Sequence, residues 1–118
     1  MRRQAQRIQE ESQRRMRMKQ VFICSPLRGD VIKNIANAKK YCRKAVQDGL
    51  LPIAPHVYFT QFLDDEIENE RKQGIAAGLQ LLDQCDEIWV FGNPTEGMKQ
   101  EIGHATERGI PVIYKDGD

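Results

Sequence analysis

The chain has 118 residues, enough for one domain with a single hydrophobic core. Its formal net charge of +1 is unevenly spread: residues 1–20 carry seven Lys/Arg and two Glu, whereas residues 21–118 carry eleven basic and fifteen acidic residues. The three cysteines form no CxxC pair, the two histidines stand alone, and no window is apolar enough for a membrane span, so a zinc-binding motif and a membrane helix are both disfavoured.

Residues 1–19 are expected to be a basic arm, helical or disordered, ahead of a single α/β domain over residues 20–118. The arm lacks the apolar centre of a secretory signal, and an odd cysteine count is typical of a reducing compartment, so a cytoplasmic location is expected. Nucleic-acid binding is not favoured, because no aromatic residues are interleaved with the basic ones. We expect neither a membrane partner nor a cofactor or metal.

The first half of the domain predicts a strand, a helix and a second strand. "QVFIC" (20–24) is β-branched and aromatic, as buried strands are. Helical periodicity follows, with Asp30 as the N-cap and Gly49 as the stop. "LLPIAP" (50–55) predicts a short strand, because its prolines limit ladder hydrogen bonds. "HVYFTQFLDD" (56–65) has no clear period and predicts a loop over one edge of the sheet.

The second half repeats the alternation of helices and strands. It predicts a helix over 65–84, a strand over 87–91, a turn-rich loop over 92–97, a helix over 98–108 and a strand over 110–114. This order predicts a parallel sheet of about four strands with helices on both faces. The expected fold is therefore a three-layer flavodoxin-like or Rossmann-like sandwich.

The loops after the first three strands are expected to meet at the carboxyl edge of that sheet, where ligands bind in such folds. "SPLRGD" after the first strand is neither GxGxxG nor a P-loop, which disfavours a dinucleotide or P-loop nucleotide site. Ser25, Arg28 and Gly29 still have the chemistry to hold an oxyanion before a helix N-terminus. The alternative is a surface Arg28 paired with Asp30.

Glu101, His56 and Tyr58 are further candidates for a site at this edge. Glu101 borders the buried stripe of the last helix near its N-terminus, where the helix dipole favours an ionised carboxylate; the alternative is a solvated glutamate. His56 follows the second strand and either contacts a ligand or caps the loop. Tyr58 is a candidate for covering a planar ligand.

Four segments, "ICSPLRG", "PHVYF", "CDEIWVFG" and "EGMKQEIGHA", together resemble the nucleoside 2-deoxyribosyltransferase-like superfamily over most of residues 20–114. They are most similar to the branch of 2′-deoxynucleoside 5′-phosphate N-hydrolases. That branch has a Gly-Ser-x-Arg-Gly-type loop, a His after the second strand and a Gly-x-x-x-Glu-[Leu/Ile]-Gly-x-Ala segment entering a late helix. The last segment is the most specific, and here it reads "GMKQEIGHA".

The resemblance implies a role for each matching position. Glu101 would be the nucleophile that attacks the anomeric carbon of a deoxynucleoside 5′-monophosphate, with water or a second base completing hydrolysis or transfer. It also implies a homodimer or a higher homo-oligomer, because such sites are often completed across a subunit interface. The expected substrate-binding residues are Ser25, Pro26, Leu27, Arg28, Gly29, His56, Tyr58, Asn93, Gly97 and Met98.

One position departs from the family pattern. Gly78 stands where the family carries the Asp that assists the leaving base. Asp64, Asp65 or Glu66 are candidates to supply that group from the preceding loop. The departure also favours an alternative function, a non-catalytic module of the same fold that binds or senses a nucleotide.

Overall fold

The computed structural model describes residues 3–9 and 17–115. Residues 3–9 of the expected basic arm are helical and exposed to solvent. Residues 1–2 and 10–16 of this arm lie outside the described residues, as do residues 116–118. The first strand of the sheet begins at Gln20.

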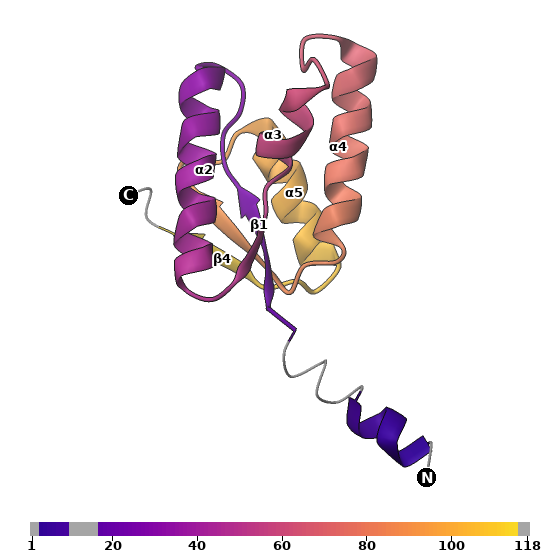
Figure 1. Ribbon diagram of the computed structural model, residues 1–118. Helices are drawn as coiled ribbons and strands as arrows, with labels where there is room; N and C mark the ends of the chain where they lie inside the picture. The colour runs from indigo at the N-terminus through magenta and orange to yellow at the C-terminus, as the bar shows by residue number, and fades with distance from the viewer. Residues whose placement is uncertain (1–2, 10–16, 116–118) are drawn as a thin grey trace.

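Within residues 17–115 a four-stranded parallel sheet forms the middle layer (Figure 1). Its strands are β1 (Gln20–Cys24), β2 (Leu51–Ile53), β3 (Glu87–Phe91) and β4 (Val112–Lys115), in the spatial order β2-β1-β3-β4. The chain goes from β1 outward to β2 and then returns to the other side of β1 to form β3. The topological switch point therefore lies between the carboxyl ends of β1 and β3, as expected for the predicted fold.

Helices cover both faces of this sheet, which confirms the predicted three-layer sandwich (Figure 1). On one face α2 (Val31–Gln47) packs Tyr41 and Ala45 against Val21, Ile23, Trp89 and Phe91. On the other face α4 (Glu68–Leu82) and α5 (Glu96–Glu107) pack against Phe22, Cys24, Ile88 and Val90. The period-two alternation of β1 and β3 thus divides one core into two apolar layers.

The predicted ends of α2 are confirmed. The Asp30 carboxylate accepts the backbone N–H of Lys33 at 3.2 Å, which makes it the N-cap. Gly49 follows the helix with a φ of +79°, a conformation that a residue with a side chain rarely adopts. The helix N-terminus consequently faces the same end of the sheet as the loop after β1.

The prediction of a loop after β2 is wrong. The segment forms the short helix α3 (Pro55–Tyr58) and the 3-10 turn η1 (Phe59–Gln61), and β2 is shorter than the predicted strand over 50–55. Pro55 occupies the first helical turn, where its fixed φ favours a helix and its missing N–H costs nothing. A single turn is too short to show a helical period in the sequence, which explains the error.

The helix predicted from residue 65 begins later, at Glu68. Residues 62–67 form turns and irregular backbone instead, and the Asp64 carboxylate accepts the backbone N–H of Glu66 at 3.0 Å. Such a local bond competes with helix formation. The delay leaves Asp65 in the connecting segment between η1 and α4, where its side chain is free to meet other parts of the site.

Candidate functional site

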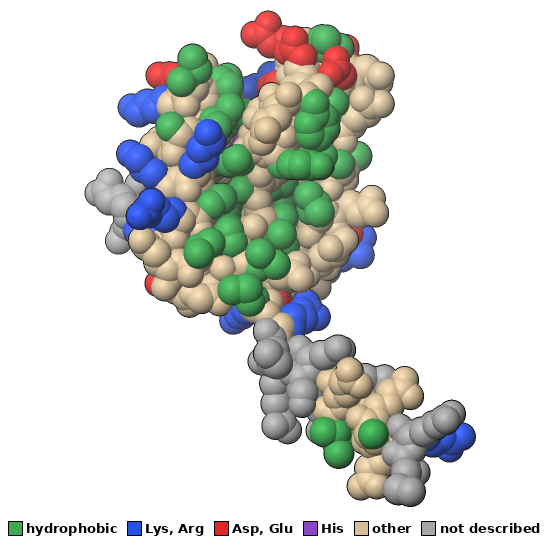
Figure 2. Space-filling model, in the orientation of Figure 1, with side chains coloured by type: hydrophobic (Ala, Val, Ile, Leu, Met, Phe, Trp, Pro, Cys, Tyr) green, Lys and Arg blue, Asp and Glu red, His purple; other side chains and the backbone are tan. Residues whose placement is uncertain are grey.

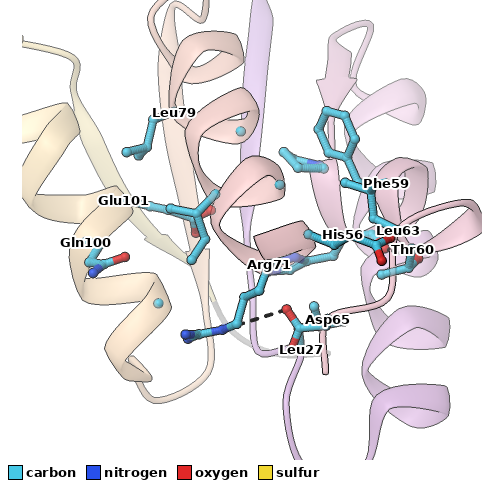
Figure 3. Close-up of a pocket in the computed structure, with 16 residues that line it drawn as sticks. Leu27, His56, Phe59, Thr60, Leu63, Asp65, Arg71, Leu79, Gln100 and Glu101 are labelled. Atoms are coloured by element: carbon cyan, nitrogen blue, oxygen red, sulfur yellow. Dashed lines mark hydrogen bonds and ion pairs between the residues drawn. The ribbon is translucent and has the colours of Figure 1, made fainter. Parts of the chain in front are cut away.

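A cavity of about 90 Å³ opens at the switch point of the sheet (Figure 3). Leu27, from the loop after β1, lines it together with His56 and Phe59 from the segment after β2. One face of α4, from Glu70 to Leu79, and the first turns of α5, with Glu101, complete its walls. The three loops that the sequence predicts at one edge therefore do converge on a single cavity.

Glu101 presents a buried carboxylate to this cavity (Figure 3). Thr95 caps α5 by accepting the backbone N–H of Met98 at 3.3 Å, and this start sets the face on which Glu101 emerges about one turn later. The side chain is half-buried as a whole, but its Oε1 atom is enclosed and has no hydrogen-bond partner. Burial raises the pKa of the Glu101 carboxyl from 4.5 to about 7.

Cys24, the last residue of β1, lies beneath this carboxylate. Its Sγ atom is 3.9 Å from the carbonyl oxygen of Met98, and its thiol also hydrogen-bonds the Glu101 carboxylate, which partly lowers the pKa of Glu101. Burial, and secondarily the charge of Glu101, raises the pKa of the Cys24 thiol far above its usual range. The thiol therefore stays protonated and acts as a weak donor rather than as a nucleophile.

His56 lines the opposite wall of the cavity and is held by its neighbours (Figure 3). Burial lowers the pKa of its imidazole, while a hydrogen bond with the backbone of Ser25 and the charge of Asp65 oppose that effect. The ring is therefore neutral at pH 7. A neutral imidazole is suited to hydrogen-bonding a hydroxyl group of a ligand.

Arg28 borders a second, wider hollow of about 1000 Å³, which also involves Leu27 and Gly29. Its Nε donates to Asp65 Oδ2 at 2.9 Å. The alternative pairing with Asp30 is not what the structure has, since the Asp30 side chain caps α2. Leu27 and Asp65 line both spaces, so the hollow and the cavity adjoin.

The expected binding residues divide into three groups. Leu27, His56 and Gly97 line the cavity with Glu101, and Arg28 and Gly29 line the hollow. The remaining five expected residues line neither space. Ser25 and Met98 are buried, Pro26 is half-buried, and Tyr58 and Asn93 are exposed. Pro26 packs its ring against Gly92 at 3.8 Å, measured to the Cβ position that Gly92 lacks.

Sequence reasoning missed the wall that α4 contributes. Arg71 lines the cavity and extends toward Asp65 (Figure 3). Gly74 and Gly78 line the cavity from the same helix without side chains. A Cβ atom on Gly78 would meet Pro55 at 3.7 Å, an ordinary contact, so packing does not force a glycine there. The signal that was available is the spacing: two glycines four residues apart in a helix strip one face of side chains.

Hydrophobic side chains remain exposed beside the site. Tyr58, Phe59 and Phe62 make mutual edge-to-face contacts with ring centroids 5.2–5.8 Å apart, yet Tyr58 is 60% exposed and Phe62 57%. Figure 2 shows green hydrophobic surface running down the side of the domain between α2 and α4. An apolar surface of this kind is typical of a contact with another molecule.

Among the described residues, no group of three or more His, Cys, Asp or Glu side chains is arranged to hold a metal ion. None of the helices in the described part of the chain is both long and apolar enough to span a membrane.

Residues 19–115 match the model of a family described as a domain of unknown function, DUF7768. The chain belongs to this family. No curated protein matches the chain. The matched range begins at the first strand and ends at the last, so it covers the whole sandwich and leaves out the basic arm.

Two solved structures have a similar fold. One is a 2-deoxyribosyltransferase from Bacillus psychrosaccharolyticus, with a TM-score of 0.62 and 16% identity over 82% of this chain and 72% of that one. The other is a 2-desoxiribosyltransferase from Leishmania mexicana, with a TM-score of 0.58 and 19% identity over 85% of this chain and 65% of that one. The chain thus has the fold of 2-deoxyribosyltransferases but spans only 72% and 65% of their lengths.

Proposed function

We propose that this chain cleaves the N-glycosidic bond of a deoxynucleoside 5′-monophosphate, with Glu101 as the nucleophile. The observation that carries the proposal is the enclosed Oε1 atom of Glu101, which lacks a partner and lies at the switch point of the sheet. Buried polar atoms are normally hydrogen-bonded, and exceptions cluster at functional sites. The likeness in fold to two 2-deoxyribosyltransferases supports the same reading.

The reaction needs the Glu101 carboxylate, the substrate and a proton for the leaving base. A Glu101 oxygen forms a bond to the anomeric carbon while the bond from that carbon to the base breaks, and the electron pair leaves with the base. The product is a glycosyl ester of Glu101. Water attacking the same carbon breaks the ester bond and gives hydrolysis, and the proton that the water loses balances the one that the base takes up. A second base attacking there gives transfer, and either step restores the carboxylate. An oxocarbenium-like transition state is stabilised by an adjacent anion, which suits Glu101.

The two adjoining spaces suit different parts of such a substrate. The cavity of about 90 Å³ is far below the roughly 300–1,000 Å³ of a typical ligand site, so it takes one small part, the sugar ring beside Glu101. The phosphate and part of the base then extend into the wider hollow beside Arg28. A 5′-phosphate on Arg28 gains charge-assisted hydrogen bonds that a nucleoside does not.

The leaving base also needs a group that protonates it. Gly78 lines the cavity but offers no side chain. Of the three acidic candidates before α4, Asp65 alone lines the cavity, while Asp64 and Glu66 line only the outer hollow. Asp65 is therefore the candidate with access to the leaving base.

The alternative is a non-catalytic module that binds a nucleotide in the same cavity. The bare position at Gly78 favours it, since a base without a proton donor is a poor leaving group. The exposed aromatic rings after β2 fit either function, because they would be covered in a homodimer. The two candidates differ in one outcome: only the enzyme releases free base.

The test is incubation with a panel of deoxynucleoside 5′-monophosphates and the matching nucleosides, followed by chromatography for free base. The Glu101→Gln variant should lose activity by several orders of magnitude, because it keeps the shape and removes the nucleophile. Glu107→Gln is the matched control, since Glu107 is an exposed glutamate on the same helix. Full activity in Glu101→Gln would end the covalent mechanism. Nucleotide binding without base release would establish the alternative.

A further inference from the structure

Two arginines share one carboxylate at the boundary between the cavity and the hollow. Arg28 Nε donates to Asp65 Oδ2 at 2.9 Å, and Arg28 Nη2 also reaches the carbonyl oxygen of Asp65 at 3.4 Å. Arg71 Nε lies 3.9 Å from the other carboxylate oxygen, Oδ1 (dashed line in Figure 3). Each oxygen of Asp65 therefore faces a different guanidinium group.

The two arginines come from different walls of the site. Arg28 belongs to the loop after β1 and lines the outer hollow, whereas Arg71 belongs to α4 and lines the cavity that contains Glu101. Asp65 lines both spaces. The position that its carboxylate occupies is thus the position where a substrate reaching from the cavity into the hollow would carry its anionic group.

A carboxylate in this position is chemically a substitute for a phosphate. Guanidinium groups bind both anions through the same paired N–H donors. The pair is also easy to open: the side chains of Arg28 and Asp65 are 61% and 30% exposed, and exposed ion pairs contribute little to stability. Asp65 lies in residues 62–67, which are turns and irregular backbone rather than helix or strand.

We propose that Arg28 and Arg71 together form a subsite for the phosphate group of a nucleotide, and that Asp65 occupies this subsite until the phosphate displaces it and frees its carboxyl group to turn into the cavity, toward the leaving base. The inference rests on the proposed function and adds the residues that hold the phosphate and the group that the phosphate displaces. Two guanidinium groups carry +2, which matches the charge of nearly −2 on a phosphate monoester at pH 7. A neutral nucleoside has no group that competes with Asp65, so the exchange selects nucleotides over nucleosides.

The experiment measures the binding of inorganic phosphate to three forms of the full chain by isothermal titration calorimetry, at pH 7 and constant ionic strength. Asp65→Asn removes the internal competitor and should tighten phosphate binding by roughly tenfold or more, the equivalent of one charge-assisted hydrogen bond. Asp64→Asn is the matched control. It changes the same charge one residue away, and its side-chain oxygen keeps an acceptor for the backbone N–H of Glu66.

A second substitution tests the role assigned to Arg71. Added to Asp65→Asn, Arg71→Gln should abolish most of the gain in phosphate affinity. Equal phosphate affinity in Asp65→Asn and Asp64→Asn would overturn the inference, and so would an Arg71→Gln change without effect. Neither result bears on Glu101: loss of base release in Glu101→Gln would still support the proposed function. The opposite outcome is also distinct. If phosphate displaces Asp65 as expected but no nucleotide releases free base, the phosphate subsite is supported and the proposed enzymatic activity is rejected.

Discussion

The Glu101→Gln variant is expected to be more stable than the wild type, by a margin that grows as the pH rises. Burial holds the pKa of the folded Glu101 carboxyl at about 7, against 4.5 for an exposed glutamate. Between these two values the folded protein keeps a proton that the unfolded chain has released. The unfolded state binds fewer protons, so the free energy of unfolding of the wild type falls as pH rises through this window. Gln has no such proton.

The size of the effect follows from the two pKa values. Relative to an unperturbed glutamate, the buried carboxyl lowers the free energy of unfolding by roughly 1 kcal/mol at pH 5 and roughly 3 kcal/mol at pH 8. The difference between the variant and the wild type should therefore grow by about 2 kcal/mol between these pH values. Packing differences between Glu and Gln are the same at both pH values and cancel in this comparison.

The assay is urea unfolding of the wild type, Glu101→Gln and the exposed control Glu107→Gln at pH 5 and pH 8, followed by circular dichroism. Only Glu101→Gln should show a stability gain that increases with pH. A constant difference between this variant and the wild type at both pH values would refute the reasoning, because it would mean that the Glu101 carboxyl titrates like an exposed one.

Four further outcomes are expected. Base release should rise with pH to a plateau above about 7, because the ionised form of Glu101 is the nucleophile; initial rates from pH 5 to 9 that show no such rise would argue against that role. Arg28→Ala should weaken nucleotide binding roughly tenfold or more beyond any effect on nucleoside binding, and equal losses would indicate a structural Arg28. Gly78→Ala should raise the free energy of unfolding by roughly 0.5–1 kcal/mol, since the added Cβ meets only Pro55 at 3.7 Å. The same methyl group should occupy part of the cavity and weaken ligand binding, and unchanged binding would show that the ligand does not use this cavity. The chain should form a homodimer through the exposed aromatic surface after β2, and a monomer mass in light scattering at tens of micromolar would contradict this.

The sandwich was predictable because its main elements have strong periods. β1 and β3 match the predicted ranges 20–24 and 87–91, since both are short continuous apolar runs bounded by turn residues. The alternation of strands and helices then fixed the parallel topology and the end of the sheet where the loops meet. The turns of α3 and η1 were missed because two single turns have no period to detect.

The candidate site was only partly predictable, because some of its residues can be recognised only from the side chains that they contact in the folded protein. In the sequence, Arg71 resembles the other charged residues of a solvent-exposed helix. The residues beside it in the sequence do not indicate that its side chain contacts Asp65. The partner of Arg28 was expected nearby in the sequence, at Asp30, but is 37 residues away. Side-chain pairing across a sheet edge depends on where two loops end in space, and local sequence patterns do not encode that.

Two atoms tie the fold to the proposed chemistry. Among the residues that the structure describes, Ser25 Oγ and Glu101 Oε1 are the buried side-chain polar atoms without a hydrogen-bond partner. Leaving such an atom unsatisfied costs about 1–3 kcal/mol, so a sequence selected for stability alone would remove it. Both atoms lie at the switch point, one directly after β1 and one on the helix after β3. Of the two, Glu101 also lines the cavity, so a ligand there that donates to Oε1 would offset the cost. The unpartnered Oε1 atom therefore indicates a binding site rather than a packing defect.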